Sequence, residues 1–145
     1  MVVLSERQIS NLIVYETPWG ALIPKPILDY LLFKGVPIKY IISIADKVRN
    51  YEWLTRSGKL HRDSFNYICD KSSVTKTWYT IIETNKYKFI ISEFGKFLLV
   101  SRRRPDGLFE KTIEYKLDDK AVKMLIALIK INEVLRNREI NKIRN

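Results

Sequence analysis

Hydrophobic side chains recur at helical spacing near the start of the chain. Ser5 and Gln8 have the spacing of a capping box, which favours the beginning of a helix. Ile9, Leu12 and Ile13 then share one helical face. We therefore expect a first helix that begins after Ser5 and ends at the following Thr-Pro-Trp-Gly turn.

Prolines mark the starts of the next two predicted helices. Pro24 and Pro26 introduce a short helix that ends before Gly35, because proline suits the first helical turn and glycine suits the position after the last one. Pro37 opens another helix, which we expect to continue to a Ser-Gly break at 57–58. Its apolar stripe predicts one buried face, formed by Ile38, Ile41, Ile42, Ala45 and Val48.

Two further segments, 62–69 and 74–84, are also expected to be helical. In the second segment, Val74, Trp78 and Ile82 fit one helical face. The same segment is rich in Thr, Trp, Tyr and Ile, which favour strands. The prediction for 74–84 is therefore helix, with strand as the alternative.

From residue 86 the hydrophobic period changes from that of a helix to that of a strand. Tyr87, Phe89 and Ile91 alternate along the chain, and a second apolar run follows a glycine-containing turn. A Pro-Asp-Gly turn and a third extended segment then complete an antiparallel hairpin or meander around 86–117.

The last predicted helix begins after Asp118, which we expect to cap it, and continues to about residue 138 or beyond. No repeat and no linker rich in Ser or Gly divides the chain. The pattern therefore predicts one domain that is α+β but mainly α. It has N-terminal helices within a helical part at 1–84, a hairpin part at 86–117, and a long C-terminal helix with a basic tail at 118–145.

Charge is the compositional feature that changes this picture most. The chain has 26 Lys and Arg against 16 Asp and Glu, a net charge of +10. The excess is +3 in residues 1–72 and +7 in residues 73–145. A charge of this size favours solubility and attraction to polyanions. With a single cysteine, no signal peptide and no apolar run long enough to span a bilayer, the sequence predicts an intracellular protein without a membrane partner.

Catalytic chemistry has few candidates in this sequence. His61 is the only histidine, and a helix containing both His61 and Cys69 would separate them by about 12 Å, too far for proton transfer. Asp118 and Asp119 are expected to serve helix capping rather than metal binding. No glycine-rich phosphate loop is present. We therefore expect no enzyme activity, no cofactor and no metal.

Basic side chains form two candidate partner-binding clusters. Arginine donates bidentately to phosphate and carboxylate, so three consecutive arginines beside a turn suit a binding role. The alternative is a charged strand edge that blocks unwanted pairing, or a solvated helix end. The hairpin cluster consists of Lys86, Lys88, Lys96, Arg102, Arg103 and Arg104, and the tail cluster of Arg136, Arg138, Lys142 and Arg144. Trp19, Trp53 and Trp78 are expected in the core rather than in a base-stacking surface, with Trp19 the one that its turn could expose.

A resemblance extends over the whole 145-residue chain. It is carried by the opening segment SERQISNLIVYETPWGALIPKPILDYLLFKG, the hairpin segment KYKFIISEFGKFLLVSRRRPDG and the basic helical end. In these segments the chain resembles the RNA polymerase inhibitory protein family of the Acidianus two-tailed archaeal virus, which is also similar to a virion structural protein of that virus. No short motif carries the resemblance, so it transfers no individual functional residue.

The resemblance implies a viral protein that binds the host's archaeal RNA polymerase inside its DNA-binding channel, in the host cytoplasm. There it is expected to obstruct DNA loading, restrain the mobile clamp and repress transcription. A channel that holds DNA is largely basic, so a protein of charge +10 cannot enter it as a mimic of DNA and is expected to contact acidic patches instead. Without the resemblance, the sequence indicates a sequence-tolerant, winged-helix-like DNA-binding protein. A third possibility, consistent with the related virion protein, is a virion structural protein.

Overall fold

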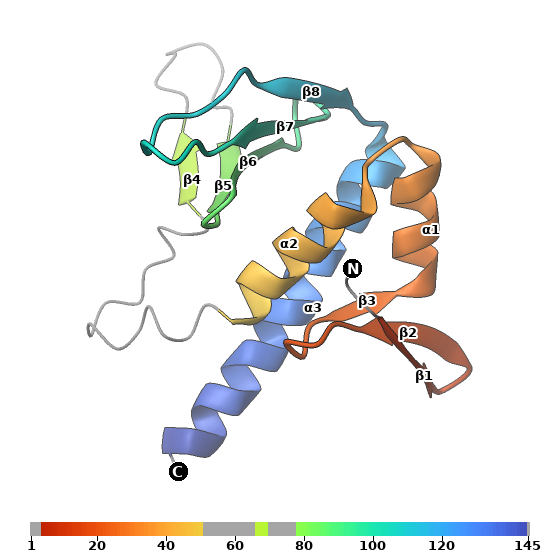
Figure 1. The fold of residues 1–145 in the computed structure, drawn as a ribbon. Helices are drawn as coiled ribbons and strands as arrows, with labels where there is room; N and C mark the ends of the chain where they lie inside the picture. Colours follow the sequence, from red (N-terminus) through yellow and green to blue (C-terminus); the bar gives the residue numbers. More distant parts are fainter. Residues whose placement is uncertain (1–3, 51–65, 70–77, 145) are drawn as a thin grey trace. The chain divides into compact units, whose positions relative to one another are not determined.

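Two compact units make up the fold, and the computed structural model describes residues 4–50, 66–69 and 78–144 of the chain. Unit 1 contains Met1–Lys59 and Met124–Asn145, and unit 2 contains Leu60–Lys123. Within the described residues there are three helices and eight strands, which Figure 1 labels in chain order. The prediction of a mainly α fold with N-terminal helices is therefore wrong: the fold is a balanced α+β one that begins with strands.

Unit 1 opens with a β-hairpin where a helix was predicted. Strands β1 (Ser5–Ile9) and β2 (Leu12–Glu16) pair antiparallel through a two-residue turn. Ser10 and Asn11 have φ values of 47° and 67°, the left-handed conformation that a type I′ hairpin turn requires at both positions. Asparagine tolerates this conformation, and the Ile, Val and Tyr side chains that follow favour a strand. These signals outweigh the capping-box spacing of Ser5 and Gln8.

A third strand and two helices complete the N-terminal part of unit 1. Strand β3 (Leu22–Pro24) pairs with β2, and helices α1 (Lys25–Phe33) and α2 (Ile38–Arg49) follow (Figure 1). The two proline-initiated helices are confirmed, and Gly35 adopts φ 89° after the first of them. Helix α2 ends at Arg49, earlier than the predicted break at 57–58, which lies outside the described residues. Of the predicted stripe only Ile38 is exposed, while Ile41, Ile42, Ala45 and Val48 are buried.

Unit 2 is built around a five-stranded antiparallel sheet in the order β4-β5-β6-β7-β8. The hairpin of β6 and β7 confirms the predicted strands after residue 86, and β8 lies inside the predicted third segment. Helix is wrong for the described parts of 62–69 and 74–84, namely 66–69 and 78–83, which pair with each other as strands. The five strands are β4 (Asn66–Cys69), β5 (Trp78–Glu83), β6 (Tyr87–Ser92), β7 (Phe97–Arg102) and β8 (Ile113–Lys116).

Cross-strand register explains the buried face of this sheet. Phe89 lies opposite Ile82 on one side and Val100 on the other, and Ile91 lies opposite Leu98, so these side chains share one face. All five are buried. Strands β5, β6 and β7 thus contribute apolar residues to one core, which requires the period of two that the sequence shows after residue 86.

Helix α3 (Asp119–Arg144) is the longest element of the chain. The Asp118 carboxylate accepts a hydrogen bond from the Ala121 backbone N–H at 2.7 Å, so the predicted N-cap is confirmed. In unit 1 the buried Asn132 side chain pairs with both backbone groups of Leu22 in β3. Its Oδ1 accepts from the Leu22 N–H at 2.8 Å, and its Nδ2 donates to the Leu22 carbonyl at 2.9 Å. The amide therefore occupies the edge of β3 in the way that another strand would.

Candidate partner-binding surfaces

The predicted hairpin cluster is divided by carboxylates of the same unit. Glu83 of β5 receives two of its cations, Lys88 Nζ at 3.8 Å and Arg103 at 3.5 Å. Both also lie near the Phe109 ring, with the Arg103 guanidinium 4.8 Å and the Lys88 ammonium 5.6 Å from its centroid. These cation–π and ionic contacts give Lys88 and Arg103 partners within the fold.

Two more predicted site residues also have carboxylate partners. Arg104 pairs with Asp106 at 2.8 Å inside its own turn. This turn is closed by a hydrogen bond from the Gly107 N–H to the Arg104 carbonyl, as its sequence predicted. Lys96 lies at the other end of the hairpin, where it reaches Asp119 at 3.2 Å. Arg104 and Lys96 therefore each have a carboxylate partner within the same unit.

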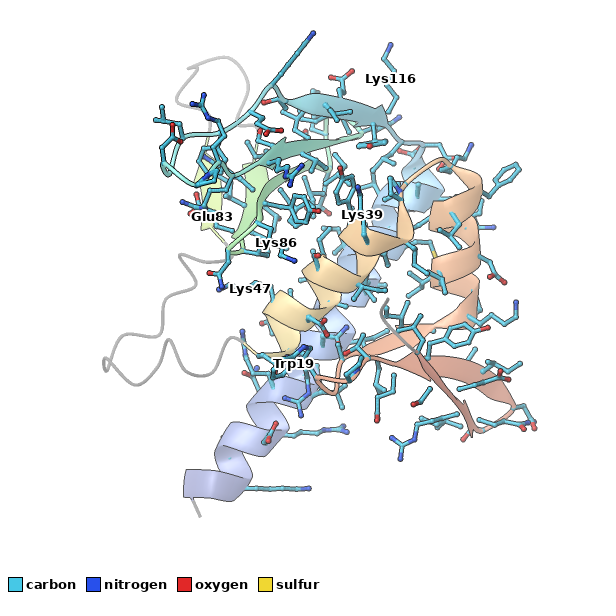
Figure 2. The ribbon with its side chains drawn as sticks, in the orientation of Figure 1. Trp19, Lys39, Lys47, Glu83, Lys86 and Lys116 are labelled. Carbon is cyan, nitrogen blue, oxygen red and sulfur yellow. The ribbon has the colours of Figure 1, made fainter. Side chains whose placement is uncertain are left out.

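Lys86 and Arg102 are the members of the hairpin cluster that stay exposed without an ion pair to any described residue. They lie at the same end of the hairpin, because Arg102 is opposite Tyr87, the neighbour of Lys86. Figure 2 shows Lys86 at this end, whereas Lys116 projects from β8 elsewhere in the unit. We call Lys86 and Arg102 the hairpin-end pair.

The tail cluster is similarly heterogeneous. Arg136 is only 6% exposed and donates to the Asn137 side chain at 3.3 Å, so it is part of the packed interior rather than a solvated tail. Arg138 and Lys142 are exposed, and the Arg144 side chain lies outside the described residues. Arg138 also borders an open apolar hollow of about 300 Å³ on α3, together with Lys130, Ile131, Val134 and Leu135.

Trp19 lies at the surface. The sequence predicted a core position for it, with exposure by its turn as the alternative. The residue is 71% exposed, and it stands on the turn between β2 and β3 (Figure 2). The Gly20 N–H donates to the Thr17 carbonyl, and the Thr17 N–H donates to the Ala21 carbonyl, both at 2.9 Å. Gly20 has φ 87°, a conformation that suits glycine. The predicted core location of Trp19 is thus wrong. Trp53 and the side chain of Trp78 lie outside what is described.

The Trp19 turn is tied to α2 by a buried threonine and a half-buried carboxylate. The Thr17 hydroxyl donates to Asp46 at 2.5 Å and accepts from the Ala21 N–H at 3.0 Å. Burial raises the pKa of the Asp46 carboxyl above its usual value of 3.8, and the hydrogen bond from Thr17 opposes part of that rise. Desolvation disfavours the charged form, so the ionised carboxylate is held here at a cost.

Replacing Asp46 with asparagine should therefore change how stability depends on pH. The folded-state pKa of Asp46 lies above the unfolded one, so its ionisation penalty is absent below pH 3.8, develops as the pH rises from the unfolded to the folded pKa, and is complete above the folded pKa. Asp46→Asn keeps an oxygen that accepts from Thr17 and removes that penalty. We expect the melting temperature of the variant, relative to wild type, to increase between about pH 3 and about pH 7. Thermal unfolding at several pH values measures this, with the exposed Glu93→Gln as control. A difference that falls with pH would contradict the assignment.

Metal-binding candidates were weak in the sequence, and the described residues add no metal-binding group. Among them, no group of three or more His, Cys, Asp or Glu side chains has a metal-binding arrangement. His61 lies outside the described residues, and Cys69 lies in strand β4 rather than in the predicted helix, so the helical separation of the two does not apply. Asp119 pairs with Lys96 rather than with a metal-binding partner. A search of the described helices for a membrane-spanning segment finds no candidate.

Comparisons of the chain with protein-family models, with curated proteins and with solved structures find no match. The geometry of the two units is therefore the basis for a functional proposal, together with the resemblance described from the sequence.

Proposed function

We propose that the chain is a non-catalytic viral protein that binds the host's archaeal RNA polymerase in its DNA-binding channel and represses transcription. It would act in the host cytoplasm by obstructing DNA loading and restraining the clamp. The hairpin-end pair and the exposed Arg138 and Lys142 of the tail cluster would bind carboxylates of the polymerase. The observation that carries the proposal is that four of the six cations of the hairpin cluster are paired with carboxylates of the protein itself, whereas the hairpin-end pair has no ion pair to a described residue.

Charge spacing favours a protein partner over duplex DNA. Non-specific DNA binding depends on several cations that neutralise successive phosphates along a continuous track. In the hairpin cluster Lys88, Lys96, Arg103 and Arg104 each have a carboxylate partner. A surface with isolated cations among anions matches a surface with isolated anions, and electrostatic complementarity of this kind provides specificity and register in protein complexes.

Net charge accounts for how such a protein would enter a basic channel. At +10 the chain is repelled by phosphate-binding surfaces and attracted to acidic ones, such as those around a catalytic metal site. Lys and Arg at the hairpin end can reach such carboxylates, and arginine donates to them bidentately. Inhibition would then follow from occupying the space that DNA needs.

Binding to purified archaeal RNA polymerase tests this function directly. The labelled protein and nuclease-treated polymerase should form a complex at ~150 mM salt, and the complex should persist when random duplex DNA is added. Promoter-complex formation should fall as the protein occupies the channel. A DNA-binding protein gives the opposite result. Its complex is lost after nuclease treatment, and its affinity for random duplex falls by ~0.9 log units per neutralised phosphate for each log unit of salt.

A further inference from the structure

The Trp19 turn joins a large exposed aromatic side chain to a fixed backbone. Tryptophan is usually well buried, since its indole carries a large apolar surface. Here 71% of the residue is exposed, at the apex of a turn in unit 1. Pro18 fixes one φ angle of this turn, and Gly20 adopts φ 87°. The side chain is thus presented to solvent by a backbone with little freedom to withdraw it.

Contacts to two helices hold this turn in place. The Thr17 hydroxyl is bonded to Asp46 of α2 and to the Ala21 N–H, so the start of the turn is fixed to that helix. At the other side, the Gly20 Cα faces the Arg49 guanidinium, since a Cβ built there would lie 3.8 Å from it. Arg49 in turn pairs with Glu139 of α3 at 2.5 Å. A preorganised side chain loses little conformational entropy when a partner covers it, which favours affinity.

The charges beside the turn favour a protein pocket over a nucleobase. Single-stranded nucleic acid binds where aromatic side chains stand along a groove of cations that follows the phosphates. The cation known to lie next to this turn is Arg49, which pairs with Glu139, and the Thr17 hydroxyl ties the turn to the Asp46 carboxyl. The ionic groups shown at the turn are therefore one cation and two carboxyl groups, which do not form a groove of cations. Such a surround suits an apolar pocket with one acceptor for the indole N–H.

We infer that Trp19 is an anchor residue that inserts into an apolar pocket on the partner protein. This inference rests on the proposed function, in which the partner is archaeal RNA polymerase. Binding energy in protein interfaces is concentrated in a few rigid, buried side chains, among which tryptophan is enriched. The hairpin-end pair, with Arg138 and Lys142, would supply steering and register, and Trp19 would supply a slow dissociation rate.

Three variants test the anchor against purified archaeal RNA polymerase. Trp19→Ala should weaken binding at least about thirtyfold, mainly through faster dissociation, and leave the melting temperature nearly unchanged. Trp19→Phe keeps an aromatic ring but no N–H donor and should recover part of the affinity. Phe33→Ala is the matched control, because Phe33 is 78% exposed in the same unit and is not part of the turn. Its affinity should match wild type.

The possible outcomes distinguish a failure of the Trp19 anchor from a failure of the proposed polymerase binding. If wild type binds polymerase and Trp19→Ala binds equally well, the anchor is refuted while the proposed function stands. If wild type does not bind polymerase, the proposed function fails and the anchor with it. A Trp19→Ala variant that loses affinity for a single-stranded thymidine oligonucleotide but not for polymerase would identify a base-stacking residue instead. A large fall in the melting temperature of Trp19→Ala would show that the Trp19 side chain stabilises the fold, which contradicts its exposed position.

Discussion

Replacing Asn132 with alanine is expected to lower the free energy of unfolding by about 3 kcal/mol, because two part-buried backbone groups of β3 would lose their partners. Asn132 is fully buried and is the partner of both the N–H and the carbonyl of Leu22. Its Nδ2 also donates to the Leu128 carbonyl at 2.9 Å, which fixes the orientation of the amide. Alanine can supply none of these bonds, and the space it leaves is too polar to be covered by apolar packing.

Denaturant unfolding followed by circular dichroism measures this change. Asn141→Ala is the matched control, because Asn141 is an exposed asparagine on the same helix and its loss should change stability by no more than about 0.5 kcal/mol. Equal stability of the Asn132 and Asn141 variants would show that the amide does not hold α3 to β3. If Asn132→Ala lowers stability but leaves the affinity for polymerase unchanged, Asn132 acts in folding and not in binding.

Local signals were sufficient for part of the fold. The two proline-initiated helices, the glycine after the first of them, and the Asp118 cap depend on residues within one or two turns of each other. The hairpin of β6 and β7 is likewise encoded by its own alternation and turn. Such elements can be predicted because the decisive contacts are close in sequence.

The wrong predictions have two physical causes. At 5–16 two local signals competed, and the positive φ values of Ser10 and Asn11 show that the turn prevailed over the capping box. At 66–69 and 78–83 the helical spacing was incidental, because β5 lies between β4 and β6 and its conformation is decided by pairing on both sides. A single strand cannot reveal such partners from its own sequence.

The candidate surfaces depend on contacts that the sequence does not reveal. The sequence identified the arginine run, of which Arg102 and Arg104 are exposed. It could not indicate that Glu83 binds Arg103 and Lys88, since this follows from the strand register. The exposure of Trp19 depends on a turn fixed by Asp46, 29 residues away from Thr17.

The second large effect concerns the hairpin-end pair. Reversing both charges in Lys86→Glu/Arg102→Glu should weaken binding to archaeal RNA polymerase about tenfold or more, because attraction to polymerase carboxylates becomes repulsion. Neither side chain has an ion pair to a described residue, so their replacement should leave stability nearly unchanged. Arg103 is excluded from the variant because its contacts with Glu83 and Phe109 belong to the fold.

A matched double variant controls for net charge alone. Lys116→Glu/Lys123→Glu alters two other exposed lysines of unit 2 and lowers the net charge of +10 by the same four units. Its affinity for polymerase should stay within about twofold of wild type, since charges outside the contact act only through screened, long-range attraction. The two double variants thus separate a specific contact from a general effect of basic charge.

The most direct test of the account is the dissociation constant of purified archaeal RNA polymerase for these two double variants, measured side by side with wild type at ~150 mM salt. The account predicts a clear loss of affinity for Lys86→Glu/Arg102→Glu and near wild-type affinity for Lys116→Glu/Lys123→Glu. Equal dissociation constants for the two variants, or undiminished binding by the hairpin-end variant, would contradict it.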